Sequence, residues 1–269
     1  VRDVFQLKHI ELLRGSMGIG HVRYPTAGSS SAAEAQPFYT NSPFGISLAH
    51  NGNLTNSEEL ITDLFDVDRR RINTESDSEA LLNLLAAEIQ RAIPDTLSGH
   101  GTLDEESVFT AVERLHRRAT GSFSVVAMIT GWGVIAIRDR HGIRPLCMGS
   151  RTQDGMVERI FASESVALDV LDFKMDRDVL PGETVIVRSN GAISSRISAP
   201  ITEARPCIFE HVYFSRPDST IDGVSVHAAR LEMGRILGER ILMENPHHGI
   251  DVVVPVPDLS LIHISEPTR

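Results

Sequence analysis

The fold prediction starts from residues 46–58, ISLAHNGNLTNSE, where a pattern typical of a strand changes to one typical of a helix. The first five residues are largely apolar, which predicts a short strand. The next three, residues 51–53, are a strong turn signal, so we expect the strand to end at His50. Thr55 and Glu58 have the spacing of a capping box, which predicts that a helix begins there.

Helix patterns and strand patterns then follow in separate blocks. Ser76 and Glu79 form a second capping box before leucines and isoleucines at helical spacing, and residues 104–118 predict a further helix. Residues 122–138 and 185–197 each predict a β-hairpin, because apolar, β-branched runs flank glycine turns. Segregated blocks of this kind predict an α+β first domain.

A change of composition marks the end of that domain. Residues 200–206 are polar and contain two prolines, as at a domain junction. A long helix over residues 225–244 follows, and then the run IDVVVPV at residues 250–256. Such a run suits a parallel strand buried on both faces, which predicts the start of an α/β domain.

The composition narrows the functional classes. The net charge of −10 argues against a general nucleic-acid or anionic-membrane binder, so neither partner is expected. No apolar run has the length of a membrane span and no signal peptide opens the sequence, so we expect a cytoplasmic location. Cys147 and Cys207 are far apart, and no metal-ligand spacing is present, so we expect no metal site in this chain.

Three groups of residues could carry chemistry. Residues 15–23 are a glycine-rich run that predicts a short strand, and the guanidinium of Arg23 at its end could hold a carboxylate. Asn51 and Gly52 could hold an oxyanion, and Asp77 could accept hydrogen bonds from an ammonium group. Each has a structural alternative, namely a surface arginine, a tight turn and a helix-capping carboxylate. Taken singly, that alternative is favoured.

Taken together, the three groups suit one ligand. Arg23 would hold an α-carboxylate, Asp77 an α-ammonium, and Asn51 with Gly52 an oxyanion on the side chain. That combination fits hydrolysis or transfer of the amide of glutamine. No nucleophile is visible beside these residues.

Several motifs, read in order, resemble a known family. They are GHVRYPTAGSS (20–30), EAQPF (34–38), LAHNGNLTN (48–56), SDSE (76–79), DRHGIRPL (139–146), ASESVALD (162–169), LPGE (180–183), FEHVYFSRPDS (209–219) and IDVVVPVPD (250–258). The first four resemble class II glutamine amidotransferases, which are N-terminal-nucleophile hydrolases. The whole set, over residues 1–258, resembles the amidophosphoribosyltransferase family.

The resemblance implies a fold and a domain division. The family fold is a four-layer αββα sandwich followed by an α/β type I phosphoribosyltransferase domain. We therefore expect an amidotransferase domain over residues 1–205, lacking its first strands, and the beginning of the second domain over residues 206–258. Residues 259–269, LSLIHISEPTR, do not match the family pattern, and we interpret them as a read-through tail.

The resemblance also implies an activity, the first committed step of purine synthesis. Glutamine, phosphoribosyl pyrophosphate and water would give 5-phosphoribosylamine, glutamate and pyrophosphate. Magnesium would accompany the pyrophosphate substrate at a site outside this chain. Cys207 matches an iron–sulfur ligand of some members, but we do not expect a cluster. Full-length members assemble into homo-oligomers.

The site residues carry over one by one. Arg23 and Thr26 match positions that bind the glutamine carboxylate, Asp77 matches the ammonium ligand, and Asn51 and Gly52 match the oxyanion hole. The family nucleophile is a cysteine at the mature N-terminus, whose own amino group serves as the base. This sequence has no such cysteine, so the chain is expected to be an inactive fragment that lacks both ends.

Two alternatives stay open. The chain could belong to another class II amidotransferase, such as the glucosamine-6-phosphate synthase type, although residues 209–219 and 250–258 argue against it. It could also be a non-catalytic glutamine-binding module, which the missing cysteine favours.

Overall fold

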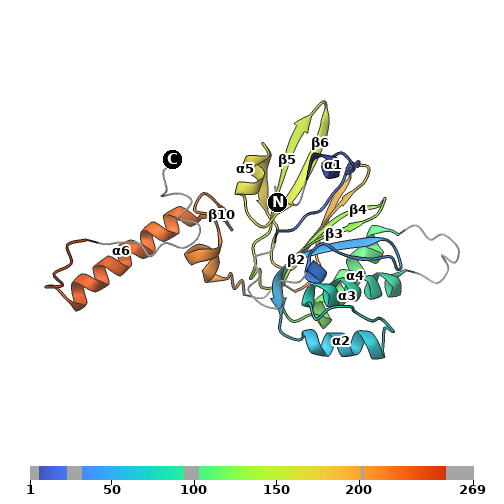
Figure 1. The fold of residues 1–269 in the computed structure, drawn as a ribbon, viewed down its shortest axis with the longest axis horizontal. Helices are drawn as coiled ribbons and strands as arrows, with labels where there is room; N and C mark the ends of the chain where they lie inside the picture. The colour runs from blue at the N-terminus through green and yellow to red at the C-terminus, as the bar shows by residue number, and fades with distance from the viewer. Residues whose placement is uncertain (1–5, 23–31, 94–102, 201–202, 253–269) are drawn as a thin grey trace. The chain divides into compact units, whose positions relative to one another are not determined.

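The computed structural model describes residues 6–22, 32–93, 103–200 and 203–252. The chain divides into two compact units, Val1–His227 and Ala228–Arg269, which are described separately (Figure 1).

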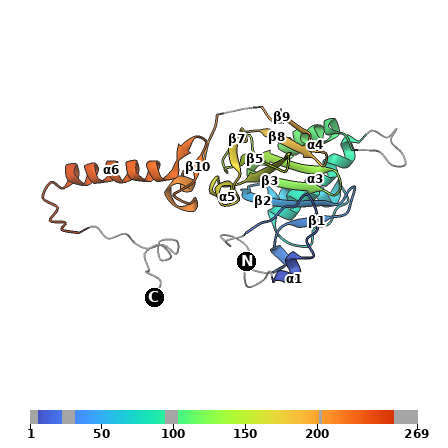
Figure 2. The ribbon, with the colours of Figure 1, turned by 90° about the horizontal axis from the view of Figure 1, so that it is seen from above.

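A six-stranded antiparallel sheet forms the centre of the first unit (Figure 2). Its strands, in spatial order, are β1 (Phe38–Thr40), β2 (Ile46–Leu54), β3 (Gly121–Ile129), β4 (Gly133–Arg138), β8 (Glu183–Arg188) and β9 (Ile193–Ile197). The hairpins expected at residues 122–138 and 185–197 are confirmed as β3–β4 and β8–β9. The strand β2 pairs with β3 along its whole length, from Ile46 opposite Ile129 to Leu54 opposite Gly121.

Helices cover one face of this sheet (Figure 1). They are α2 (Ser57–Asp66), α3 (Asp77–Ala92) and α4 (Glu105–Arg118). Every residue from Ser78 to Ile89 of α3 is buried, because α2 and α4 pack beside it and the sheet lies against it. Full burial of one leucine side chain stabilises the fold by roughly 1.5–3 kcal/mol. This layer therefore forms the main core.

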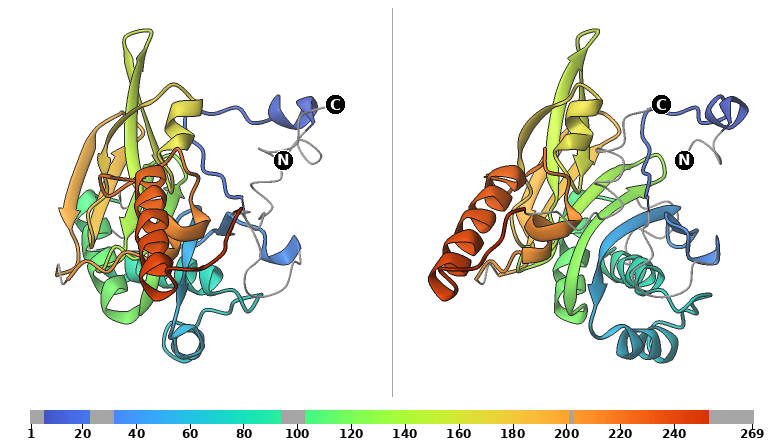
Figure 3. Two further views of the ribbon diagram at one scale, coloured as in Figure 1. Left: turned by 90° about the vertical axis from the view of Figure 1, so that its left-hand side faces the viewer. Right: turned by 60° about the vertical axis from the view of Figure 1, so that its left-hand side comes forward.

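A smaller antiparallel sheet covers the other face (Figures 1 and 3). Its strands, in spatial order, are β6 (Met156–Ala162), β5 (Cys147–Gln153) and β7 (Lys174–Asp178). A second core fills the space between the sheets, where Met148 packs with Ala136 and Val185. The short helix α5 (Val166–Val170) lies on the small sheet, with Leu168 against Gly149. The layer order is thus αββα.

Residues after 203 continue the first unit. The side chain of Arg138, which is 1% exposed, donates to both carboxylate oxygens of Asp222 at 2.7 and 2.8 Å. Because such contacts continue beyond residue 205, the compact unit extends to His227. The further elements here are the π-helical turn η3 (Glu210–Phe214), β10 (Thr220–Ile221) and β11 (Val224–Ser225). The domain division proposed from the motifs stays a prediction.

Helix α6 (Val226–Glu244) leads into the second unit and confirms the long helix expected over residues 225–244. Most of the strand expected at residues 250–256 lies outside the described residues, and residues 250–252 form no strand. The remaining short elements lie near the N-terminus: α1 (Leu7–Ile10) and the 3-10 turn η1 (Ala32–Glu34).

Three local predictions are wrong. Residues 51–53 are not a turn, because β2 continues to Leu54 on its β3 partner. Thr55 does not cap a helix: its N–H and its hydroxyl both donate to the carbonyl of Thr120, and α2 begins after Asn56. Residues 15–22 form no strand. By contrast, Ser76 caps α3 as expected.

Candidate functional site

The outer edge of β2, meaning the side of residues 50–54 that faces away from β3, carries the candidate site. In an antiparallel strand, alternate N–H groups point to opposite sides. The N–H of His50 donates to Gln36 Oε1 at 2.7 Å, and that of Leu54 donates to Asp77 Oδ2 at 2.9 Å. The N–H of Asn53 donates instead to Ser122 Oγ on β3. The N–H of Gly52 therefore points to the outer edge, between Gln36 and Asp77.

Gly52 is required by close packing rather than by a turn. A Cβ atom there would collide with the carbonyl oxygen of Ser122 and with the ring of His50. The φ angle of Gly52 is not positive, so a left-handed conformation is not the reason for glycine. No described residue accepts the hydrogen bond of the Gly52 N–H, which leaves this donor available to a ligand.

Both polar atoms of the Asn51 side-chain amide form hydrogen bonds. Its Oδ1 accepts from Arg144 Nη2 at 2.9 Å, and its Nδ2 donates to Ser163 Oγ at 3.2 Å. Since Nδ2 carries two hydrogens, the bond to Ser163 leaves one N–H for a further acceptor. Asn51 and Gly52 thus supply two donors from adjacent residues of one strand.

Asp77 lies beside this strand because α3 begins there. Its carboxylate accepts from the N–H of Leu54, so the residue fastens α3 to β2. Asp77 stands in the first turn of α3, where Ser76 is the capping residue, and its carboxylate lies beside β2 at Leu54, two residues along the chain from Gly52. Its role as a ligand for an ammonium group stays a prediction. The Asp77 side chain is 23% exposed.

His50 lies beside Asp77 but does not neutralise the charge of its carboxylate. The ring of His50 is buried, with Nδ1 3.0 Å from Ser78 Oγ and Nε2 3.3 Å from the carbonyl of Ser122. Burial lowers the pKa of His50, although the nearby Asp77 carboxylate opposes that shift. The imidazole is therefore neutral at pH 7. Its contact with Asp77 at 3.8 Å therefore supplies no positive charge, and no other described cation pairs with this carboxylate.

Arg23 and Thr26 lie outside the described residues, so their roles stay predictions. The structure does bring together the other three predicted residues, Asn51, Gly52 and Asp77. Sequence reasoning missed the residues that hold them in place: Gln36, His50, Ser78, Arg144 and Ser163. All five lie within the motifs EAQPF, LAHNGNLTN, SDSE, DRHGIRPL and ASESVALD, but nothing in the local patterns indicated their partners.

Neither cysteine belongs to this arrangement. Cys147 is buried on β5, where its thiol donates to the carbonyl of Ala162, and burial raises its pKa to about 12. Cys207 lies in the segment after residue 203 and is partly exposed. Among the described residues, no three His, Cys, Asp or Glu side chains are placed to hold a metal ion.

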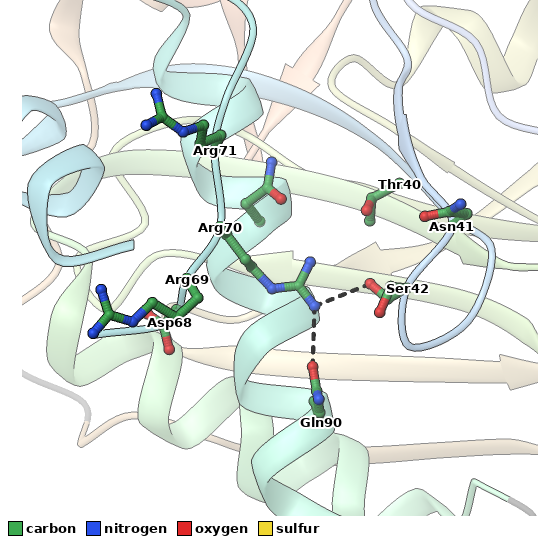
Figure 4. A pocket seen from close by; sticks show the side chains of 9 residues that line it. Thr40, Asn41, Ser42, Asp68, Arg69, Arg70, Arg71 and Gln90 are labelled. Carbon is green, nitrogen blue, oxygen red and sulfur yellow. Dashed lines mark hydrogen bonds between the residues drawn. The ribbon is translucent and has the colours of Figure 1, made fainter. Parts of the chain in front are cut away.

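A hollow of about 340 Å³ lies elsewhere, between the loops that follow β1 and α2 (Figure 4). Arg70 in its wall donates to the carbonyl of Ser42 and to Gln90 Oε1. Figure 4 shows Arg69 and Arg71 pointing away from Arg70. The three guanidinium groups do not converge on one ligand, and the hollow includes none of the site residues on β2 or α3.

Comparison with known proteins identifies the family of the chain. Residues 21–170 match the family model described as glutamine amidotransferase domain. An amidophosphoribosyltransferase of Pseudomonas aeruginosa is 55% identical over 260 residues, which is 97% of this chain and 51% of the relative. The Escherichia coli and Saccharomyces cerevisiae enzymes of the same name are 52% and 46% identical, over 97% and 96% of this chain and 50% of each relative. The chain thus spans about half the length of these relatives.

Two solved structures are similar to the fold. Glutamine phosphoribosylpyrophosphate amidotransferase from B. subtilis, complexed with ADP and GMP, has a TM-score of 0.65 and 32% identity. The match covers 81% of this chain and 43% of that structure's chain. The allosteric regulatory enzyme of purine biosynthesis has a TM-score of 0.66 and 27% identity. The match covers 93% of this chain and 56% of that structure's chain. In the described part of this chain, no helix has the length and apolar character needed to cross a bilayer. The chain belongs to the glutamine amidotransferase domain family, and the relatives that it matches there are amidophosphoribosyltransferases.

Proposed function

We propose that this chain is the glutamine-hydrolysing part of an amidophosphoribosyltransferase. The whole enzyme would convert glutamine, phosphoribosyl pyrophosphate and water into 5-phosphoribosylamine, glutamate and pyrophosphate. The family match over residues 21–170 and the names of the relatives support this activity. They favour neither a glucosamine-6-phosphate synthase nor a non-catalytic binding module.

The observation that carries the proposal is the pair of donors on β2. Attack on the glutamine amide carbon turns its carbonyl oxygen into an oxyanion. The N–H of Gly52 and the second N–H of Asn51 Nδ2 are two adjacent donors for that oxygen. Loss of one such donor typically lowers kcat by about 10²–10³. Arg144 and Ser163 hold the Asn51 amide, and pairing with β3 holds Gly52, so these donors need little reorganisation during the reaction.

The two charged ends of glutamine have separate partners in the proposal. Asp77, beside β2, accepts hydrogen bonds from the α-ammonium group. Arg23 and Thr26 bind the α-carboxylate, as the family resemblance implies. Asp77 then determines where the α-ammonium group of glutamine lies, while Asn51 and Gly52 determine where its side-chain carbonyl lies.

The nucleophile is proposed to be an N-terminal cysteine that the 269 residues do not contain. Cys147 is buried with a raised pKa, and Cys207 is an internal residue without an α-amino group to act as base. The chain by itself is therefore expected to release no glutamate from glutamine, and release above a buffer blank would contradict this. Magnesium is proposed to accompany the pyrophosphate substrate of the whole enzyme, at a site outside this chain.

Substitution of Asp77 tests the proposed glutamine site. Asp77→Asn keeps an oxygen acceptor for the N–H of Leu54 but removes the charge that an ammonium group requires. Hydrogen bonds to charged groups contribute about 1.5–3 kcal/mol, so we expect glutamine affinity to fall about 10- to 100-fold. Isothermal titration of the chain with glutamine measures the change.

Asp104→Asn is the matched control. Asp104 caps α4 through Ser107, far along the chain from β2, and asparagine caps a helix about as well as aspartate. This variant should bind glutamine like the wild type. Equal affinities of wild type and Asp77→Asn would refute the assigned role of Asp77. Binding of glutamate as tightly as glutamine would count against an amide-specific site.

A further inference from the structure

Arg144 connects the proposed oxyanion donors to the segment that follows residue 205. It lies in the motif DRHGIRPL between β4 and β5, and its side chain is 20% exposed. Its backbone is fixed, because its carbonyl accepts from Arg138 Nε at 2.9 Å and from Ser124 Oγ at 3.0 Å. The guanidinium then reaches Asn51 at one nitrogen and Glu210 at another, each at 2.9 Å.

The contact with Asn51 fixes the direction of that amide. A guanidinium group can only donate hydrogen bonds, so the Asn51 atom facing Arg144 must be the oxygen. A flip of the amide would place its NH₂ group against the guanidinium and lose the bond. Arg144 therefore forces Nδ2 to the other side, where Ser163 Oγ takes one hydrogen and the second remains for a ligand.

We propose that Arg144 is a positioning residue for glutamine hydrolysis, which holds the Asn51 amide in the orientation that donates to the oxyanion. The proposal rests on the proposed function of the site. It adds a residue that acts through Asn51 rather than on the substrate. A charged donor on Oδ1 also polarises the amide and strengthens the donor at Nδ2.

Glu210 anchors Arg144 from the other side. The Glu210 side chain is 5% exposed, and its Oε2 accepts from Ser215 Oγ at 2.7 Å. The approach of Arg144 to Oε1 is a charge contact and not an aligned hydrogen bond. The ring of Phe214 lies 5.3 Å from the guanidinium carbon. Removal of Arg144 would leave a buried carboxylate unpaired, so its substitution also carries a stability cost.

Backbone hydrogen bonds join the two segments that carry this contact. The N–H of Arg205 donates to the carbonyl of His141 at 2.8 Å, and that of Cys207 donates to the carbonyl of Ile143 at 3.0 Å. Glu210 is therefore held next to Arg144 by residues that come shortly before it in the chain. The glutamine site accordingly includes residues beyond 205.

Kinetics of an extended enzyme, in which this chain follows its N-terminal cysteine, test the proposal. Asn51→Ala removes the donor, and we expect kcat for glutamate release to fall about 100-fold. Arg144→Ala should lower kcat by about 10- to 100-fold while KM changes by less than about threefold, because orientation matters most in the transition state. Arg144→Lys should restore part of the loss, since lysine supplies a donor but not a planar fork.

The double variant separates positioning from general damage. If Arg144 acts through Asn51, Arg144→Ala causes no further loss of kcat in the Asn51→Ala background. If the loss of kcat in the double variant instead equals the product of the two single losses, the proposal is overturned. Glu210→Gln, which keeps the side-chain volume, should give a smaller loss in kcat of the same kind. An unchanged kcat in Arg144→Ala would also overturn it.

Arg151→Ala is the matched control. Arg151 likewise pairs with a carboxylate, that of Glu158, and lies over an aromatic ring, that of Phe173, but it contacts no residue of the site. This variant should keep the wild-type kcat. A wild-type extended enzyme that releases no glutamate would reject the proposed function and this inference with it. If the wild-type enzyme releases glutamate but the losses of kcat multiply in the double variant, only the role of Arg144 is rejected.

Discussion

Cys147 and Cys207 lie in different environments, which predicts different reactivity. Burial raises the pKa of Cys147 to about 12, and only the thiolate reacts with alkylating agents. We expect the native chain at pH 8 to take up one equivalent of iodoacetamide, at Cys207, and a second equivalent only after unfolding. Mass spectrometry of the labelled chain measures both. Cys207→Ser should leave the native chain unlabelled, whereas rapid double labelling would contradict the buried position of Cys147.

The site residues that the sequence suggested are those whose chemistry is local. Asn51, Gly52 and Asp77 could be proposed because an amide, a backbone N–H and a carboxylate suit an oxyanion and an ammonium group. The structure places the three together, and their roles stay predictions. Arg144 could not be found in this way. It lies 93 residues from Asn51 in the chain, and the contact exists only because the folded chain brings the β4–β5 connection to β2. No spacing rule predicts a pair of that kind.

At the scale of the element, Gly52 makes a testable contribution to β2. A Cβ atom at this position would meet the Ser122 backbone, so Gly52→Ala must push β2 and β3 apart. We expect a loss of stability of about 1–3 kcal/mol, as for other overpacked sites. Urea unfolding followed by circular dichroism measures it. Gly18→Ala is the control, because a Cβ there meets nothing within 4 Å. An equal midpoint for Gly52→Ala and wild type would contradict the packing argument.

The elements also show why some boundaries could be predicted and others could not. Ser76 and Asp104 cap α3 and α4 through side-chain bonds to residues two or three positions away, so the sequence pattern was sufficient. Residues 51–54 have the local signal of a turn, but pairing with Gly121–Ser124 on β3 keeps them extended. Non-local pairing overrode local propensity, as is common in strands.

For the whole molecule, the layer order came from the resemblance and not from the residue pattern. Periodicity predicted α+β, which is correct, but it could not show that β4 pairs with β8 across 44 intervening residues, between Arg138 and Glu183. It also could not show that Arg138 pairs with Asp222. Such contacts decide where the compact unit ends, and they appear only once the chain is folded.

The buried histidines make the stability of the whole molecule fall in acid. Burial lowers the pKa of His50, and it lowers that of His116 from 6.5 to about 4, with Arg140 adding to the shift. The unfolded chain therefore binds protons at a higher pH than the folded chain. The stability from neutral His116 is fully present above pH 6.5 and is lost as the pH falls toward about 4. This shift corresponds to about 3 kcal/mol for His116.

The variant His116→Phe isolates this effect. Neither ring nitrogen of His116 has a hydrogen-bond partner among the described residues, and the ring packs 5.2 Å from that of Phe123, so phenylalanine suits the site. Urea unfolding at pH 7.5, 5.5 and 4.5 should show a smaller loss of stability on acidification than in the wild type. His247→Phe, at an exposed position, should leave the loss unchanged. If His116→Phe follows the wild-type curve throughout, then proton uptake at other groups, with His50 foremost, governs acid unfolding, because a residue that no longer titrates cannot contribute to the slope.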